Sequence, residues 1–222
     1  MKYRHEWKHE IGYADMLAVR SRMSKIAESD AHALNGKYKI RSLYFDTLSD
    51  RALKEKIDGV NMREKFRLRY YNGDLSFIRL EKKTKINGLC LKESVPVNVE
   101  TVRAISEGDF GKLLNSGEPL LDESYTKIKC GLAPKTIVDY TREPFVFEPG
   151  NVRVTLDYDI RTGIKNTDFL NTDSVTVSVE DSPIILEVKW DEYLPDIIKD
   201  ALQLKNCRVG AFSKYAVCRI YG

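Results

Sequence analysis

The 222-residue chain lacks three features that would point directly to a function. Its four cysteines, Cys90, Cys130, Cys207 and Cys218, include no CxxC pair and have no histidine nearby at the spacing of metal ligands. It has no glycine-rich phosphate loop of the P-loop type, and no apolar run that approaches the length of a membrane-spanning helix. These absences argue against a cysteine-based zinc site, a backbone nest for nucleotide phosphates and a helical membrane span.

The chain also has little excess of charge of either sign. Thirty-six Lys and Arg residues stand against 33 Asp and Glu residues, and the formal net charge is only +3. Any positive field must therefore come from the arrangement of charges, which argues against a general nucleic-acid coating protein but leaves a local anion site open. The first ten residues have no apolar segment typical of a secretion signal. We therefore expect a cytoplasmic protein with reduced thiols.

What the sequence does have is a recurrent period-two alternation of charged and apolar residues. Five stretches show it: Arg4-x-Glu6-x-Lys8, Lys65-x-Arg67-x-Arg69, Arg79-x-Glu81-x-Lys83, Arg153-x-Thr155-x-Asp157 and Glu187-x-Lys189. Successive side chains of a strand point to opposite faces, so the charges share one face and the apolar residues between them share the other. A solvated face is the simple interpretation. Five strands rich in Arg, Lys and Glu also fit a surface that binds a polyanion with a metal.

The rest of the pattern predicts one α+β domain over residues 1–222. Strands are expected at 3–11, 39–46, 64–71, 75–84, 89–97, 135–142, 151–158, 184–191 and 215–221, mostly joined by hairpins such as the one at 72–74. Helical spacing is expected within 12–29, within 100–130, where Phe110, Leu113 and Leu114 contribute, and at 195–205. We find no internal repeat and no low-complexity linker, so we expect about eight strands in one sheet.

The charged face has different consequences in an open sheet and in a closed barrel. An open antiparallel sheet is commonly wet on one side, whereas a barrel would place the charges in an enclosed lumen. There, unpaired charge is costly unless a ligand or a counter-ion compensates for it. Arginine is heavily used in these stretches, and its planar guanidinium suits bidentate contacts with phosphate. The interpretation as a merely solvated face is therefore weakened when the strands are taken together.

Seven short motifs occur in the order found in one known family. They are Arg4-x-Glu6-x-Lys8, Ser42-Leu43-Tyr44-Phe45-Asp46-Thr47, Lys65-x-Arg67-x-Arg69-x-Tyr71, Leu80-Glu81-Lys82-Lys83-Thr84, Arg153-Val154-Thr155-Leu156-Asp157, Leu186-Glu187-Val188-Lys189 and Phe212-Ser213-Lys214-Tyr215. By these motifs the sequence resembles VTC-type polyphosphate polymerase domains, which belong to the triphosphate tunnel metalloenzymes and are related to CYTH phosphatases. Each motif alone is weak, but their common order covers nearly the whole chain.

The resemblance implies an eight-stranded antiparallel tunnel with basic walls and a divalent metal, Mn²⁺ or Mg²⁺, at one side. It implies phosphate contacts for Lys8, Arg67, Arg69, Lys83, Arg142, Arg153, Lys189 and Lys214, with a supporting hydrogen bond from Tyr44. Glu187 is implied as the leading metal ligand, and Lys8, Arg67, Arg69 and Glu187 as the catalytic group. The implied reaction transfers the terminal phosphate of ATP to a growing polyphosphate chain and releases ADP.

Two further carboxylates have alternative interpretations. Glu6 is a second-choice metal ligand, or else a counter-ion of Lys8 or Arg4. Glu81 is a weaker candidate ligand, or else a counter-ion of Arg67 or Arg69. Both readings are compatible with a basic lumen, because carboxylates there either bind metal or neutralise cations.

Three other positions, Asp157, Lys83 and Arg142, depend on strand register. Arg142 follows Tyr140 and precedes Glu143-Pro144, so its register depends on where its strand ends. Asp157 shares the face of Arg153 and is either a metal-side carboxylate or the partner of that arginine. Alternation from Glu81 favours Lys83 over Lys82 on the charged face. The broader superfamily opens with Glu-x-Glu-x-Lys, and Arg4 replaces the first of these glutamates here, which favours polymerase over hydrolase chemistry.

The sequence leaves alternative functions open. A triphosphatase of the same fold and a polyphosphate-binding module without turnover both fit the pattern. The expected ligands are ATP and inorganic polyphosphate, with no nucleic acid and no direct membrane insertion. Eukaryotic members of the resembled family carry separate regulatory and membrane-spanning regions, for which this chain has no room. Coupling of synthesis to membrane transfer would thus require a membrane-associated or regulatory protein partner.

Overall fold

The computed structural model describes residues 4–87, 89–108, 117–181, 183–204, 208–210 and 212–220. The chain divides into two compact units, each built from several separate segments. Unit 1 comprises Met1–Lys39, Tyr140–Ile160 and Glu180–Ser213, and unit 2 comprises Ile40–Asp139, Arg161–Val179 and Lys214–Gly222. The expectation of a single domain over the whole chain stays a prediction.

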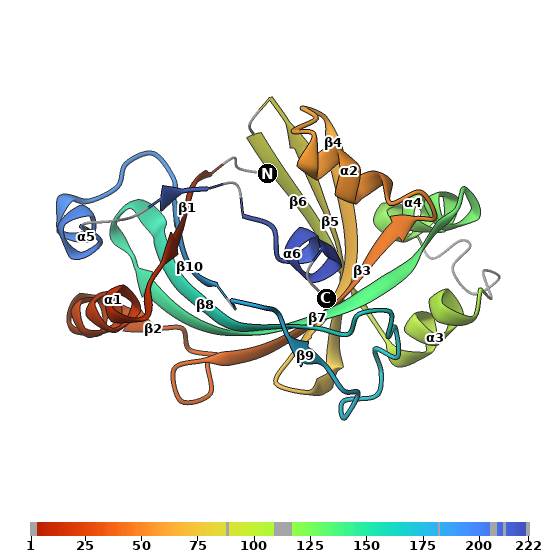
Figure 1. Cartoon of the computed structure of the whole chain (residues 1–222), viewed down its shortest axis with the longest axis horizontal. Helices are drawn as coiled ribbons and strands as arrows, with labels where there is room; N and C mark the ends of the chain where they lie inside the picture. Colours follow the sequence, from red (N-terminus) through yellow and green to blue (C-terminus); the bar gives the residue numbers. More distant parts are fainter. Residues whose placement is uncertain are drawn as a thin grey trace. The chain divides into compact units, whose positions relative to one another are not determined.

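The described residues form a mixed set of strands and short helices (Figure 1). The strands are β1 His5–Ile11, β2 Glu28–Ser29, β3 Tyr38–Thr47, β4 Arg63–Tyr71, β5 Asp74–Ile86, β6 Leu89–Val97, β7 Leu132–Phe147, β8 Val152–Thr162, β9 Val177–Ser178, β10 Ile184–Trp190 and β11 Arg208–Val209. The helices are α1 Tyr13–Ile26, α2 Arg51–Ile57, α3 Val99–Glu107, α4 Pro119–Lys129, α5 Asp196–Ala201 and α6 Lys214–Ile220, with a 3₁₀ turn at Pro149–Asn151. The α+β class is therefore confirmed.

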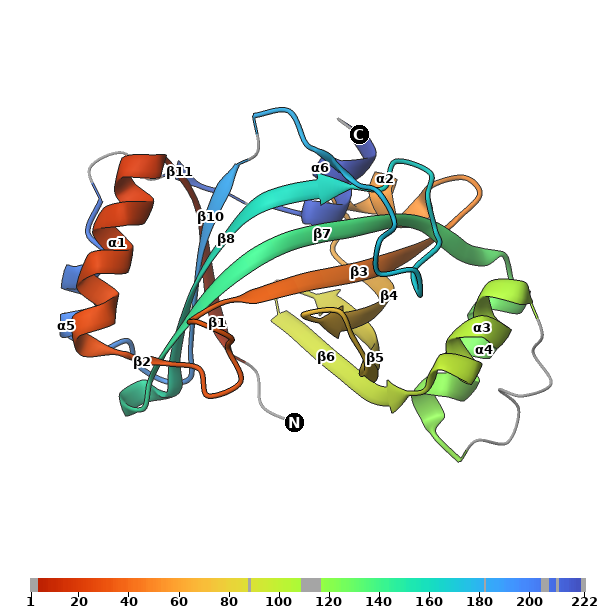
Figure 2. The same cartoon turned by 90° about the horizontal axis from the view of Figure 1, so that it is seen from below.

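Unit 1 is built around the strand order β11-β1-β10-β8-β7. Along β8, Val152, Val154 and Leu156 are fully buried, because alternate residues of the strand point into one apolar core. Helices α1 and α5 lie on the same face of this sheet (Figure 2). Helix α1 contributes Met16 and Met23 to the core. The other residues of β8 are thereby left to the opposite, charged face.

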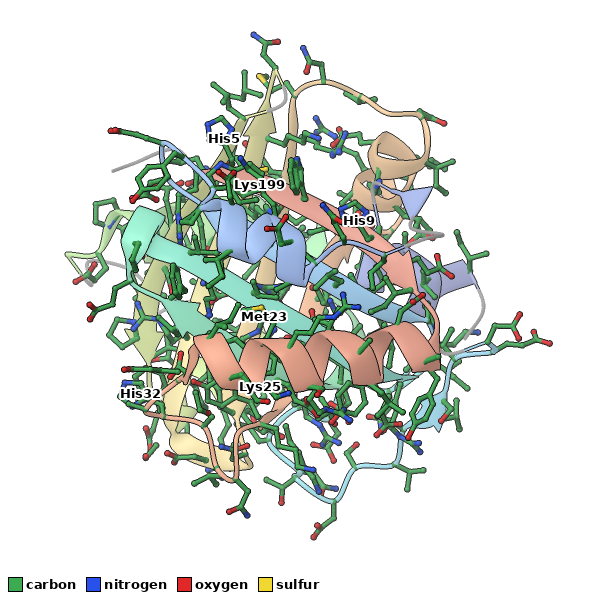
Figure 3. All side chains as sticks on the ribbon, turned by 90° about the vertical axis from the view of Figure 1, so that its left-hand side faces the viewer. His5, His9, Met23, Lys25, His32 and Lys199 are labelled. Atoms are coloured by element: carbon green, nitrogen blue, oxygen red, sulfur yellow. The ribbon has the colours of Figure 1, made fainter. Side chains whose placement is uncertain are left out.

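Figure 3 shows unit 1 from the side that carries α1 and α5. His5 and His9 lie on the part of β1 that is visible from the side of α1 and α5, and Met23 lies between α1 and the sheet. Residues 6 and 8 alternate with these histidines and so point to the other face. His5 and His9 therefore do not join the charged groups of the opposite face of β1.

Unit 2 is built around the strand order β7-β3-β4-β5-β6. Its core contains Leu43, Leu68 and Leu80, one from each of three neighbouring strands, and each is at most 2% exposed. Helices α3 and α4 pack on β5 and β6 from the apolar side (Figures 1 and 2). Asn98 begins α3 and accepts a hydrogen bond from the backbone N–H of Thr101, a typical N-cap.

The expected eight strands are confirmed, but the expected closed barrel is wrong. Three of the eleven strands are two residues long, which leaves eight longer ones in the part of the chain that the structure describes. Their order is a path that ends at β11 and at β6, and no pairing among the described residues joins these ends. Alternation reports which way a side chain points, but it carries no information on whether the outer strands pair.

The expected closing strand at 215–221 is also wrong. Residues Lys214–Ile220 form helix α6 instead. The Tyr, Val and Ile content of this segment favours a strand locally, but tertiary contacts override it. The ring of Tyr215 stacks on Tyr44 at 5.1 Å, and its hydroxyl donates to the carboxylate of Asp46 at 2.6 Å. Thr162 donates a hydrogen bond to the carbonyl of Cys218 in the same helix.

Other expectations concern single residues. Cys90, Cys130 and Cys218 are free cysteines, as expected, whereas Cys207 lies outside the described residues. The helical residues expected at Phe110, Leu113 and Leu114 also lie outside them. Among the helices that the structure describes, none is long and apolar enough to cross a membrane.

Candidate functional site

The structure gathers the predicted site residues into two charged clusters, one in each unit. The unit 1 cluster consists of Glu6, Lys8, Arg142, Asp157, Glu187 and Lys189. The unit 2 cluster consists of Tyr44, Lys65, Arg67, Arg69, Glu81, Lys83 and Lys92. Both follow directly from antiparallel register, because residues directly opposite each other on neighbouring strands point to the same face.

Two cross-strand rows build the unit 1 cluster. Glu6 on β1 lies opposite Lys189 on β10, and Lys8 lies opposite Glu187. Each row thus pairs one acid with one base. A further contact joins the two rows diagonally: Lys189 Nζ lies 2.9 Å from the carboxylate of Glu187.

Glu187 lies at the centre of this cluster and is 5% exposed. Its carboxylate is contacted by Lys8 Nζ at 3.7 Å and by the Arg142 guanidinium at 3.1 Å. Burial would raise the pKa of Glu187, but the charges of Lys189 and Lys8 outweigh burial and hold this pKa well below its ordinary value. Burial likewise would lower the pKa of Lys8, yet Glu187 and Glu6 raise it. The central acid and base are therefore both ionised at neutral pH.

Arg142 connects Glu187 to a second buried carboxylate. Its Nε and a terminal nitrogen donate to both oxygens of Asp157, at 2.6 and 2.7 Å. Burial alone would lower the pKa of Arg142, but Asp157 and other anionic groups raise it well above its ordinary value. Asp157 is therefore the partner of Arg142, and the alternative partnership with Arg153 is wrong. Strand β7 continues past Arg142 to Phe147, so Arg142 is an internal strand residue.

One polar atom near Glu187 lacks a partner. Thr155 on β8 lies opposite Glu187 in the register and is 3% exposed, and its hydroxyl has no hydrogen bond within the described protein. A buried hydroxyl without a partner costs free energy unless water or a ligand satisfies it. The row Lys8, Glu187 and Thr155 therefore has one hydrogen-bonding group that the described protein does not satisfy.

The unit 2 cluster is centred on Glu81, which is 2% exposed. Arg67 donates to its carboxylate at 2.6 Å, and Arg69 lies 3.9 Å from the same oxygen while donating to the hydroxyl of Ser42. Lys92 on β6 contacts the other oxygen at 2.5 Å. Burial would raise the pKa of Glu81, but Arg67 and Arg69 outweigh it and lower this pKa far below its ordinary value. The counter-ion interpretation of Glu81 is confirmed.

Tyr44 completes the arginine side of this cluster. Arg67 donates a hydrogen bond to its hydroxyl at 2.9 Å and lies over its ring at 5.7 Å. Burial opposes ionisation of the phenol, yet the charges of Arg67 and Arg69 lower the pKa of Tyr44 overall. The expected hydrogen-bonding role of Tyr44 therefore has a structural basis.

A second row of this sheet carries three lysines. Lys65 on β4 lies opposite Lys83 on β5, which lies opposite Lys92 on β6. Lys82 points to the other face, where it contacts Glu123 at 2.6 Å. The sequence-based choice of Lys83 over Lys82 for the charged face is therefore confirmed.

Two further predicted phosphate contacts are Arg153, which extends the row of Glu6 and Lys189, and Lys214. Arg153 lies opposite Lys189 on the charged face of β8, and it makes an ion pair with Asp30 at 2.9 Å. Lys214 begins α6, and its charge contributes to the lowered pKa of Tyr44. The roles of both residues in binding phosphate stay predictions.

The sequence predicts a divalent metal at Glu187 and Glu6. Among the described residues, no group of three or more His, Cys, Asp and Glu side chains has the arrangement of a metal site. Mg²⁺ often binds through only one or two carboxylates, with substrate phosphates and water as its other ligands. Ionised Glu187 and the orphan hydroxyl of Thr155 fit that mode. Glu6 also lies near Lys8 and Lys189, at 3.5 Å from each, whereas Arg4 pairs with Asp191.

Some members of the clusters were not identified from the sequence. Lys92 was missed, although the short hairpin at Asn87 fixes the register that places it opposite Lys83. Thr155 gave no signal, because an orphan hydroxyl exists only once the strands are paired. Asp30 lies outside the regular strands, so alternation could not have placed it against Arg153.

Comparison with known proteins agrees with these observations. The family model described as the VTC domain matches residues 3–220. Among solved structures, the fold is similar to that of a protein from Hippeastrum reported to have a dominant triphosphatase activity, with 13% identity and a TM-score of 0.60 over 98% of this chain and 95% of the other. It is also similar to a protein from Bacillus halodurans assigned as an adenylate cyclase, with 12% identity and a TM-score of 0.51 over 85% and 80%. No curated protein matches the sequence.

Proposed function

Because the chain belongs to the VTC domain family, we propose that it is a metal-dependent polyphosphate polymerase. It transfers the γ-phosphate of ATP to a growing inorganic polyphosphate chain and releases ADP. The observation that carries the proposal is the ionised carboxylate of Glu187 among Lys8, Arg142 and Lys189. A carboxylate in a basic cluster repels phosphate unless a cation lies between them, so this arrangement fits a metal–phosphate complex.

The metal is Mn²⁺ or Mg²⁺, held by Glu187 with Glu6 as a second ligand. When bound, it neutralises charge on the phosphate oxygens. Lys8 and Lys189, which neutralise the carboxylates in the structure described here, are then available to donate to phosphate oxygens. Arg142 stays fixed by Asp157, so it presents its remaining donors without reorganisation.

The unit 2 cluster supplies cationic donors for phosphate. Phosphoryl transfer needs little covalent help from a protein and much alignment and charge stabilisation. Arg67 and Arg69 are preorganised for this, because Glu81, Tyr44 and Ser42 fix their guanidinium groups. Arg153 and Lys214 are proposed as further phosphate contacts on the same chemical grounds.

A triphosphatase is the second candidate. The Hippeastrum protein with a similar fold has a dominant triphosphatase activity, and the same charged groups would serve attack by water as well as attack by a phosphate chain. What distinguishes the two reactions is the acceptor of the phosphoryl group. Charge alone does not select between them.

The test is incubation of the full chain with ATP and Mn²⁺, followed by gel analysis of long-chain phosphate and by assays for ADP and orthophosphate. Polymer that grows in step with ADP supports the polymerase. Orthophosphate without polymer favours the triphosphatase. Retained polyphosphate binding without ATP consumption points to a binding module and excludes both enzymes.

A further inference from the structure

Lys65 occupies a special position in the unit 2 cluster. Strand alternation places it on the same face as Arg67, one row away from Glu81. Its own row contains Lys83 and Lys92. The neighbouring row has a buried carboxylate to balance its arginine, whereas this row consists of three lysines.

The groups around Lys65 come from five elements. They are Lys56 of α2, Arg63 of β4, Lys83 of β5, Asp46 of β3 and Tyr215 of α6, whose ring lies 5.5 Å from Lys65 Nζ. Three of these groups are cations. Asp46 favours the charged form of Lys65, whereas the three cations disfavour it. The oxygens of Asp46 already accept hydrogen bonds from the Tyr215 hydroxyl and from the backbone N–H groups of Ala52 and Leu53.

This environment disfavours the charged form of Lys65. Burial, followed by the charges of Lys56, Arg63 and Lys83, lowers the pKa of Lys65 to about 7. The charged form of Lys65 is therefore less favoured than that of an ordinary lysine. An anion bound against the lysine row would favour the charged form of Lys65, because it adds negative charge beside three lysines.

We propose that Lys65 is a further phosphate-contacting residue and that it takes up a proton when a triphosphate or polyphosphate binds to the unit 2 cluster. The inference rests on the proposed function only in taking a phosphate polyanion as the ligand. Proton uptake makes binding depend on pH in a defined direction. The bound state holds more protons than the free state at pH values above 7, so affinity falls as pH rises, by at most about tenfold per pH unit.

Isothermal titration calorimetry with inorganic triphosphate tests this directly. The titration is done without divalent metal at pH 7.5 and 8.5, in two buffers of different ionisation enthalpy, so that the buffer dependence of the heat gives the number of protons taken up. The terminal phosphates of triphosphate also exchange protons in this range, so the proton uptake of Lys65 is taken as the difference between the wild-type chain and the Lys65→Arg variant titrated under the same conditions. We expect the wild-type chain to take up as much as one proton and to bind more weakly at pH 8.5.

Two substitutions of Lys65 distinguish an effect of its protonation from a purely structural role of its side chain. Lys65→Met should abolish the proton uptake and weaken binding at pH 7.5 by about 5- to 20-fold, since one charge-assisted contact is lost. Lys65→Arg should also abolish the uptake, because arginine stays charged throughout, but it should retain most of the affinity. A purely structural lysine would not produce this contrast. Thermal unfolding confirms that both variants fold, and Lys65→Arg serves alone if Lys65→Met does not.

Lys82→Met is the matched control, since it removes one lysine from the opposite face of the neighbouring strand. It should leave the proton uptake unchanged. The proposal is overturned if the wild-type chain binds no triphosphate, if it binds without proton uptake, or if both Lys65 variants keep the wild-type uptake. A chain that binds with proton uptake but neither polymerises nor hydrolyses ATP overturns only the proposed function.

Discussion

The two charged clusters differ in how far each is neutralised by its own unit. The unit 1 cluster contains the three carboxylates Glu6, Asp157 and Glu187 and the three cations Lys8, Arg142 and Lys189. The unit 2 cluster contains the single carboxylate Glu81 and five basic residues, Lys65, Arg67, Arg69, Lys83 and Lys92. A balanced cluster must gain a cation before it favours an anion, whereas a cationic cluster accepts one directly. Under the proposed function, the comparison predicts metal dependence for the unit 1 cluster and metal-independent anion binding for the unit 2 cluster.

Substitution of Glu187 tests the predicted metal dependence of the unit 1 cluster and should have the largest effect. Glu187→Gln should reduce metal-dependent turnover by about 10³-fold, or ~4 kcal/mol, because the carboxylate that fits the metal is lost. Metal-free triphosphate binding should become tighter in the same variant, because a negative charge has gone. Steady-state kinetics with Mn²⁺ and calorimetry without it measure the two effects. Full activity in this variant would refute the metal assignment.

Substitution of Glu81 tests how much this carboxylate stabilises the unit 2 cluster. Glu81→Gln leaves Arg67, Arg69 and Lys92 without their buried counter-ion, so unfolding should become easier by about 3 kcal/mol. Because the folded-state pKa of Glu81 is depressed, the stabilisation is present above its ordinary value of 4.5 and is lost as pH falls further. Denaturant unfolding at pH 7 and pH 3 measures this. An equal difference between variant and wild type at both pH values would contradict it.

Substitution of Arg67 tests whether the unit 2 cluster binds phosphate. Arg67→Ala should weaken metal-free triphosphate binding by about 10- to 100-fold, since charge-assisted hydrogen bonds are lost. Arg20→Ala is a control, because that arginine pairs with Glu143 on a different part of the chain. Titration calorimetry compares the two variants. Equal affinities would show that Arg67 serves only as the partner of Glu81.

Substitution of Asp30 tests the position of Arg153 and should have the smallest effect. Asp30→Asn removes the carboxylate that pairs with this partly exposed arginine, so phosphate affinity should rise by less than about threefold. The effect should disappear in an Arg153→Ala background. Binding measured for both single variants and the double variant forms a complete cycle. Unchanged affinity in all three would place Arg153 outside the phosphate-binding group.

Sequence alternation predicted the long strands and the charged face well, because both follow from the direction of side chains along one strand. It failed at α6, where the contacts of Tyr215 with Tyr44 and Asp46 outweigh a local preference for strand. It also failed to give the partner of Arg153, since Asp30 lies outside the regular strands.

The lowered pKa of Lys65 was equally inaccessible from the sequence. Its low pKa arises from burial and from charges on neighbouring elements, none of which alternation can reveal. The partners of Arg142, Asp157 and Glu187, could not be predicted either. Side-chain contacts between strands depend on which strands pair and in which register, as well as on the face to which each side chain points.

The discontinuous make-up of the two units also affects how the protein is made. Lys8 near the start of the chain meets Glu187 only after β10 has been synthesised, and unit 2 includes segment Lys214–Gly222 at the very end. Neither unit can therefore be completed while the ribosome is still producing the middle of the chain. The β3–β6 meander has mostly local pairings and can form early, whereas β1 must wait for its distant partner. A nascent chain would thus expose β1 without its partner until β10 has been synthesised, a stage at which chaperones or a slow folding step become important.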